Sequence, residues 1–143
     1  LLEKALLLRG WEEGFVAAFR LHNRGAEPVS GTLCSEWNLN MLSGEGGERY
    51  YDGLGEPRGL SSSGAALGVH DFRVVDGWRN VAARAALDRD CAVLRYPVET
   101  ASLSEAGAEK IHQGICLKIL FPVSLAPGKI DSYSARWMFY SVA

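Results

Sequence analysis

The chain has 143 residues, of which 48% are hydrophobic and 22% charged, and its formal net charge is -2 at pH 7. This length fits a single domain, and the apolar share is enough for a hydrophobic core and excludes a disordered chain. The 15 lysines and arginines are scattered without a basic block, so a nucleic-acid partner is not expected.

Alternating apolar and polar residues recur along the first third of the chain and predict β-strands. Residues 1–10 (LLEKALLLRG) suit a helix or a strand by propensity, and their setting favours a strand. In residues 15–23, we expect one face to hold Phe15, Ala17, Phe19 and Leu21. Residues 31–42 contain several large apolar side chains, and we predict a strand that is buried on both faces.

The middle of the chain begins with its least regular stretch, residues 42–68, which is rich in glycine and predicts a long functional or mobile loop. Residues 71–76 (DFRVVD) then alternate like a strand. Residues 81–90 (VAARAALDRD) could form a short helix, but strands flank them and we predict a strand.

The last third predicts three further strands, in residues 91–100, 114–123 and 129–142. Their expected faces hold Ala92, Leu94, Tyr96 and Val98; Ile115, Leu117, Ile119, Phe121 and Val123; and Tyr133, Trp137 and Phe139. Pro127 and Gly128 predict a type II turn that joins the last two strands into a hairpin. Residues 98–114, between two of these strands, read as a long polar connection.

Seven to nine strands with short turns and no repeating helix predict an all-β fold, an antiparallel β-sandwich spanning residues 1–143 as one domain. The chain opens in what reads as the middle of a strand and without Met, so we expect an excerpt of a longer multidomain protein. Three cysteines without close pairs favour reduced, buried thiols and a cytoplasmic setting. No apolar run approaches the roughly 20 residues that span a bilayer, so no membrane partner is expected.

The acidic residues and histidines give weak signals for catalysis or metal binding. Glu99, Glu105 and Glu109 lie within eleven residues, and paired carboxylates can hydrolyse glycosidic bonds. Exposed glutamates in a polar connection are the commoner case, so we assign no catalytic residue. His112 and Cys116, four apart in a strand, would be about 13 Å apart, too far for one zinc ion. Two acids, Glu48 and Asp52, are too few for calcium, so no metal or cofactor is expected.

Aromatic residues beside polar ones indicate sugar binding more clearly, because pyranose C–H faces stack on aromatic rings while hydroxyl groups need polar partners. Tyr50 and Tyr51 follow Arg49 in the glycine-rich stretch, and extended backbone would bury one of the two tyrosines. Trp37 and Trp78 lie beside polar residues, and Glu36, Asn38 and Asn40 would form a polar row on one strand face. The competing interpretation is that Trp37 and Trp137 belong to the core.

Three segments in order resemble the C-terminal domain of family-57 glycoside hydrolases, the 4-α-glucanotransferase and α-amylase group: EWNLNMLSGEGGERYYDG, DFRVVDGW and LRYPVETASLSEAGAEKIHQG. The resemblance covers residues 33–123. The matching positions are Trp37-Asn38, Tyr50-Tyr51, Pro97, Glu99-Thr100, Ser104-Glu105, Gly107 and Gln113-Gly114.

The resemblance implies a galactose-mutarotase-like β-sandwich that packs on a catalytic barrel of the same polypeptide and lacks the catalytic residues. It makes Glu99, Glu105 and Gln113 candidates for interdomain or sugar contacts. The leading hypothesis is therefore a non-catalytic accessory domain of an α-glucan-acting enzyme. An independent carbohydrate-binding module is the alternative. A third hypothesis, a small sugar epimerase, would need Glu99 or Glu105 to converge with His112 or His70.

Overall fold

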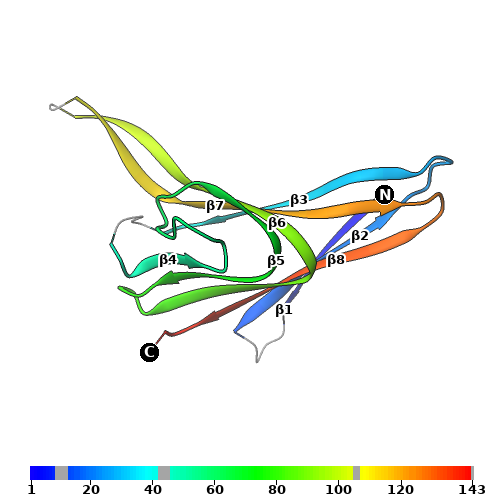
Figure 1. Cartoon of the computed structure of the whole chain (residues 1–143), viewed down its shortest axis with the longest axis horizontal. Coiled ribbons are helices and arrows are strands. Elements are labelled where there is room, and N and C mark those ends of the chain that lie inside the picture. Colours follow the sequence, from blue (N-terminus) through cyan, green and yellow to red (C-terminus); the bar gives the residue numbers. More distant parts are fainter. Residues whose placement is uncertain (9–12, 42–45, 105–106, 143) are drawn as a thin grey trace.

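The computed structural model describes residues 1–8, 13–41, 46–104 and 107–142, which form eight β-strands (Figure 1). The strands are β1 (Leu2–Leu8), β2 (Gly14–His22), β3 (Val29–Leu39), β4 (Arg49–Asp52), β5 (Gly64–Asp76), β6 (Val81–Ser104), β7 (Gly107–Leu125) and β8 (Ile130–Tyr140). Every pairing between them is antiparallel. The described part of the chain contains no helix that is long and apolar enough to cross a membrane. The all-β prediction is confirmed, including a strand at 81–90, where alanine propensity alone would have allowed a helix.

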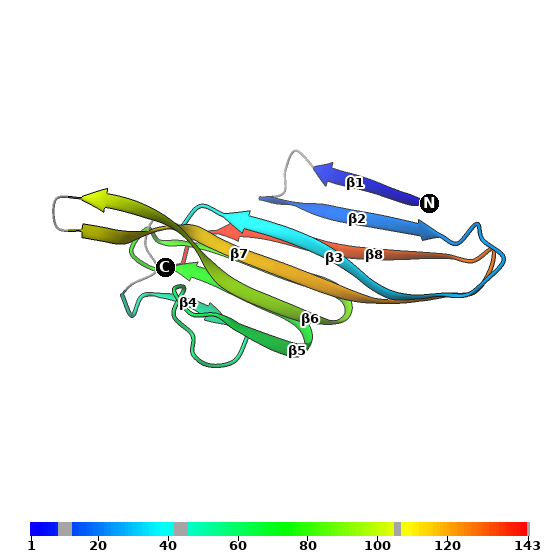
Figure 2. The ribbon, with the colours of Figure 1, turned by 90° about the horizontal axis from the view of Figure 1, so that it is seen from above.

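Two sets of strands share β6, and this makes the sheet a sandwich. One set runs in the order β1-β2-β8-β6-β5-β4, and β3 and β7 extend from β6 as the other. The early part of β6, Ala82–Leu87, pairs with β8, whereas its later part, from Ala92 onward, pairs with β7. Strand β6 therefore passes from one layer to the other, and Figure 2 shows β3 crossing in front of β8. Register shifts in β5 between Ala66 and Asp71 let that strand follow the bend.

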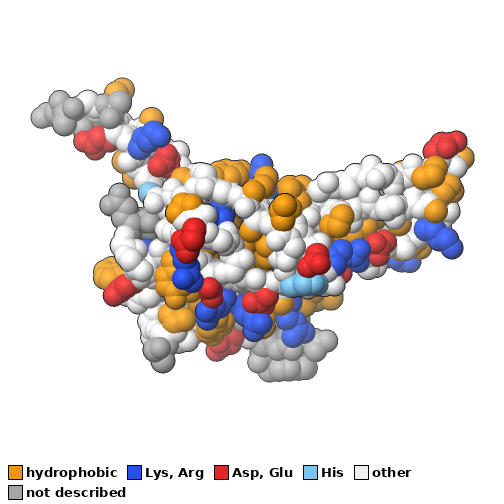
Figure 3. Space-filling view, in the orientation of Figure 1, with side chains coloured by type: hydrophobic (Ala, Val, Ile, Leu, Met, Phe, Trp, Pro, Cys, Tyr) orange, Lys and Arg blue, Asp and Glu red, His pale blue; other side chains and the backbone are white. Residues whose placement is uncertain are grey.

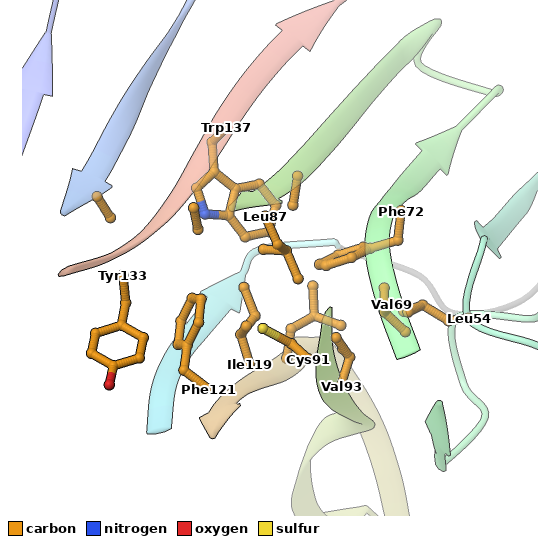
Figure 4. Packing of buried hydrophobic residues seen from close by; sticks show 14 of the residues in the cluster. Leu54, Val69, Phe72, Leu87, Cys91, Val93, Ile119, Phe121, Tyr133 and Trp137 are labelled. Atoms are coloured by element: carbon orange, nitrogen blue, oxygen red, sulfur yellow. The ribbon is translucent and has the colours of Figure 1, made fainter. Parts of the chain in front are cut away.

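The core fills the space between the layers with large aromatic rings. The Trp37 and Trp137 ring centroids are 5.2 Å apart, and Phe72 meets Trp137 edge-on at 5.8 Å. The Phe121 ring centroid lies 6.2 Å from that of Phe19 and 5.8 Å from that of Tyr133, and Figure 4 shows Phe121 beside Tyr133. These rings come from strands in both layers, so their contacts hold the layers together. The apolar face predicted for residues 114–123 is confirmed, because all five of its members are buried.

The predicted faces of two other segments differ from the structure. Strand β3 is buried on one face only, since Cys34, Glu36 and Asn38 point outward and are exposed. Cys34 is therefore an exposed thiol, contrary to the expectation of three buried ones. On β6 the inward face holds Cys91, Val93 and Arg95, while the predicted apolar row from Ala92 to Val98 lies outside.

The turn at Pro127-Gly128 forms, but the predicted hairpin does not. The Lys129 amide donates to the Ala126 carbonyl at 3.1 Å, and Gly128 has a φ of 71°. However, β7 pairs with β3 and β6, whereas β8 pairs with β2 and β6. The turn therefore carries the chain from one layer to the other, because its two strands belong to different layers.

The predicted polar connection at 98–114 is also wrong in form, because it is a β-hairpin. The pairing of β6 with β7 continues from Val98↔Gly114 out to Ser104↔Gly107. This two-stranded ribbon, residues 98–104 and 107–114, projects from the body of the domain in both ribbon views, and we call it the arm (Figures 1 and 2).

Candidate functional site

A groove of about 330 Å³ runs along strand β4 and brings together two of the residues predicted for sugar binding, Arg49 and Tyr50. Its lining is Gly46, Gly47, Arg49, Tyr50, Arg58 and Gly59. Strand β4 lies at the end of its sheet and pairs with β5 along its full length. Three of the lining residues are glycines, so part of the groove wall beside the tyrosine ring and the two guanidinium groups is backbone. We call this hollow the β4 groove.

The tyrosine pair divides as strand geometry requires. Tyr51 is fully buried, and its hydroxyl group donates to the Leu60 carbonyl at 3.3 Å. Burial raises the pKa of Tyr51 well above that of a free tyrosine. Tyr50 is half-buried and lines the groove, and its backbone forms an isolated antiparallel β-bridge with Gly59. The expectation that one tyrosine is buried is thus confirmed, and Tyr51 cannot contact a ligand in this arrangement.

Beside the groove, arginine and carboxylate side chains of β4, β5 and the loop between them pair with one another, and Figure 3 shows blue and red side chains lying next to each other over these strands. The Arg58 guanidinium group lies over the Tyr50 ring, 5.2 Å from its centroid, and donates to Asp52 Oδ1 at 2.9 Å. Arg73 Nε donates to the other oxygen of Asp52, also at 2.9 Å. The hydrogen bonds from Arg73 and the charges of both guanidinium groups lower the pKa of Asp52, although partial burial opposes them. Asp52 is therefore a partner of two arginines.

Arg49 connects the groove to Trp78. Its guanidinium carbon lies 5.2 Å from the Trp78 ring centroid, and its Nε donates to Asp76 at 3.1 Å. Trp78 is 70% exposed, whereas Asp76 is buried. Because Asp52 and Asp76 balance much of the arginine charge, the surroundings of the groove suit a neutral hydroxylated ligand better than a strongly charged anion.

A buried arginine that the sequence analysis did not select holds the loop beside the groove. Arg95 is 2% exposed and donates to the carbonyl groups of Leu54, at 2.6 Å, and Pro57, at 2.7 Å. Its guanidinium group also lies 5.2 Å from the Tyr51 ring centroid. Arg95 thereby fixes the loop that presents Arg58. Its inward position on β6, among apolar side chains, gave no signal in the sequence.

The other predicted residues on β3 lie away from the β4 groove. The Trp37 ring packs on Trp137 and Phe15, so Trp37 is largely a core residue. Glu36 is on the outer face, accepts a hydrogen bond from Asn38 at 3.2 Å and pairs with Lys118 at 3.3 Å. Glu36 and Asn38 thus form a polar row on the outer face of β3.

The remaining predicted residues lie on or near the arm. Glu99 stands opposite His112 and pairs with Lys110 at 3.3 Å. Gln113 donates to Thr100 at 3.2 Å. A smaller groove of about 210 Å³ at the base of the arm is lined by Asn38, Leu39, Asn40, Val98, Gln113, Gly114 and Ile115. Glu105 lies outside the described residues. The nine predicted residues that the structure describes are therefore distributed over separate parts of the domain.

The fold is that of a β-sandwich domain, and the comparisons with known proteins identify its family. Residues 1–130 match the family "Alpha-amylase/4-alpha-glucanotransferase, C-terminal", and the chain belongs to this family. It is 30% identical over 118 residues to Alpha-amylase 1 of Dictyoglomus thermophilum, a match that covers 82% of the chain and 17% of that protein.

A solved structure agrees with this assignment. The crystal structure of 4-alpha-glucanotransferase from Thermococcus litoralis resembles 96% of the chain with a TM-score of 0.66 and 25% identity, over 18% of its own length. The resemblance found in the sequence is thus confirmed. The chain spans less than a fifth of either relative.

Proposed function

We propose that the chain is a non-catalytic accessory domain of an α-glucan-acting enzyme of the α-amylase or 4-α-glucanotransferase type, and that it braces the catalytic domain of the same polypeptide. The supporting observation is the family match over residues 1–130, together with relatives of which the matched region is less than a fifth. Catalytic residues are assigned to the remainder of the polypeptide. The three free cysteines support a cytoplasmic location, since reducing compartments keep thiols unpaired.

We further propose that the β4 groove contacts the α-glucan. Tyr50 offers part of its ring to the C–H face of a pyranose, while Arg49 and Arg58 and the glycine backbone can hydrogen-bond to hydroxyl groups. Trp78 extends the aromatic surface beyond Arg49. A groove of about 330 Å³ corresponds to one or two sugar units of a malto-oligosaccharide. If the isolated chain binds sugar in this groove, the domain also acts as a carbohydrate-binding module.

Calorimetric titration of the chain with maltoheptaose tests the sugar contact. We expect a dissociation constant between micromolar and low millimolar, and at least a tenfold loss of affinity for Tyr50→Ala. Tyr96→Ala is the matched control, because Tyr96 is also half-buried and also has a cation, Lys118, 5.5 Å from its ring centroid, but lies on β6. No binding heat, or an equal loss in both variants, would remove the groove from the proposal.

The accessory role has a separate test. The chain alone should neither hydrolyse nor transfer malto-oligosaccharides, while the full-length polypeptide should do so. Deleting the domain from that polypeptide should lower its thermal stability. Glucan turnover by the chain alone would contradict the non-catalytic role.

A further inference from the structure

The arm is the part of the sandwich where β6 and β7 have only each other as strand partners. The last pair between β5 and β6 is Gly64↔Arg95, and the last pair between β3 and β7 is Leu39↔Ile115. Beyond Val98↔Gly114, no third strand of the described chain joins the ribbon. Isolated two-stranded ribbons are only marginally stable in water, so we expect the arm to gain order from contact with another part of a larger structure.

Apolar side chains project from both faces of the arm. Leu103 is 89% exposed, Ile111 43% and Val98 36%. Ile111 pairs with Thr100 on one face, whereas Leu103 belongs to the alternate set of residues on the other face. A flat partner would cover one of these faces and leave the other in water. A recess that surrounds the arm would cover both.

The base of the arm is held firmly, so its direction is set before any partner binds. Gln113 is the extra residue of a β-bulge between the pairs Val98↔Gly114 and Glu99↔His112. A Cβ atom on Gly114 would lie 2.5 Å from the Leu39 carbonyl oxygen, so β7 approaches β3 more closely here than any other residue type would allow. A preset direction lowers the ordering cost of docking.

We propose that the arm inserts into an apolar recess in the remaining part of the same polypeptide and is the main element that docks this domain. This inference rests on the accessory role proposed above. We infer that the partner of the arm is the rest of the same polypeptide. More than four-fifths of each relative lies outside the matched region, and this provides a surface large enough to enclose the arm. Lys110 pairs with Glu99 within the arm at 3.3 Å, and the exposed Leu103 and Ile111 are its anchors in the recess.

Amide hydrogen exchange, measured in the 143-residue chain and in the full-length polypeptide, tests this inference. We expect the amides of residues 99–104 and 107–113 to exchange at least tenfold more slowly in the full-length polypeptide. Leu103→Asp should abolish that protection and lower the melting temperature of the full-length polypeptide. Leu67→Asp is the matched control, since Leu67 is 82% exposed on β5, away from the arm.

Equal exchange in both forms, or equal effects of the two substitutions, would overturn the docking role. Protection that appears in the 143-residue chain as its concentration rises would instead assign the arm to self-association and also overturn it. Activity on maltoheptaose separates this result from the proposed function. A full-length polypeptide that processes the sugar but leaves the arm unprotected retains the accessory role and loses the docking inference. A full-length polypeptide that protects the arm but does not process the sugar retains the docking inference and loses the proposed function.

Discussion

Gly64 lies directly against the guanidinium group of Arg95. A Cβ atom on residue 64 would be 3.0 Å from Arg95 Cζ and 3.0 Å from its Nη2. The same guanidinium group holds the Leu54 and Pro57 carbonyls, so the absence of a side chain at residue 64 allows the loop beside the β4 groove to be fixed from within.

Gly64→Ala should therefore destabilise the domain through Arg95. Displacing the guanidinium group weakens two charge-assisted hydrogen bonds, so we expect a loss of about 1–3 kcal/mol in the free energy of unfolding. Gly31→Ala is the control, because nothing lies within 4 Å of a Cβ atom there, and it should change stability by less than about 1 kcal/mol. Urea denaturation measures both. Equal effects would mean that Arg95 moves aside freely.

The buried Trp137 and the exposed Trp78 should respond very differently to truncation. Trp137 is 1% exposed and contacts rings from β3 and β5, so Trp137→Ala should cost about 3–5 kcal/mol or prevent folding. Trp78 is 70% exposed, and Trp78→Ala should cost less than about 1 kcal/mol. Thermal melts compare the two variants. A large loss for Trp78→Ala would show that Arg49 and Trp78 stabilise the β4 edge more than their exposure indicates.

Asp52 should make stability depend on acid pH. Because its pKa is lowered in the folded state, mainly by hydrogen bonds from Arg73, the native state holds this carboxylate ionised more firmly than the unfolded chain does. Its contribution is present above the pKa of an unfolded aspartate, about 4, and is lost as the pH falls through the lower native value. Asp52→Asn should flatten the fall in unfolding free energy below about pH 4. Parallel curves for the two proteins would assign the acid sensitivity to other groups.

The cysteines should differ in reactivity. Cys34 is exposed on β3, whereas Cys91 and Cys116 are buried. Burial also raises the pKa of the Cys91 thiol to about 11, so little thiolate forms there near neutral pH. A thiol reagent at pH 8 should modify one cysteine rapidly in the native protein and all three after denaturation. Cys34→Ser should remove the fast phase. Rapid reaction of two thiols in the native state would show that β6 or β7 opens readily.

Local sequence patterns were enough to predict the strands, several of the core faces and the family resemblance. Alternation of apolar and polar residues reports which side of a strand is buried, as at Phe19 and Ile119, because each strand is a local pattern with a period of two. The adjacent tyrosines showed in the same way that one of them must turn inward, though not that it would be Tyr51.

The pairing of the strands, and the position of the arm and the groove on the surface, depend on the tertiary fold. Residues 98–114 look polar along the chain, but pairing of β6 with β7 makes them an arm, because strand partners are set by contacts between distant residues. Arg95 is charged, yet it is buried, and its two Nη atoms donate to carbonyl groups from a loop some forty residues earlier. The β4 groove uses the same long-range contact, because Arg95 holds the loop from which Arg58 reaches over the Tyr50 ring.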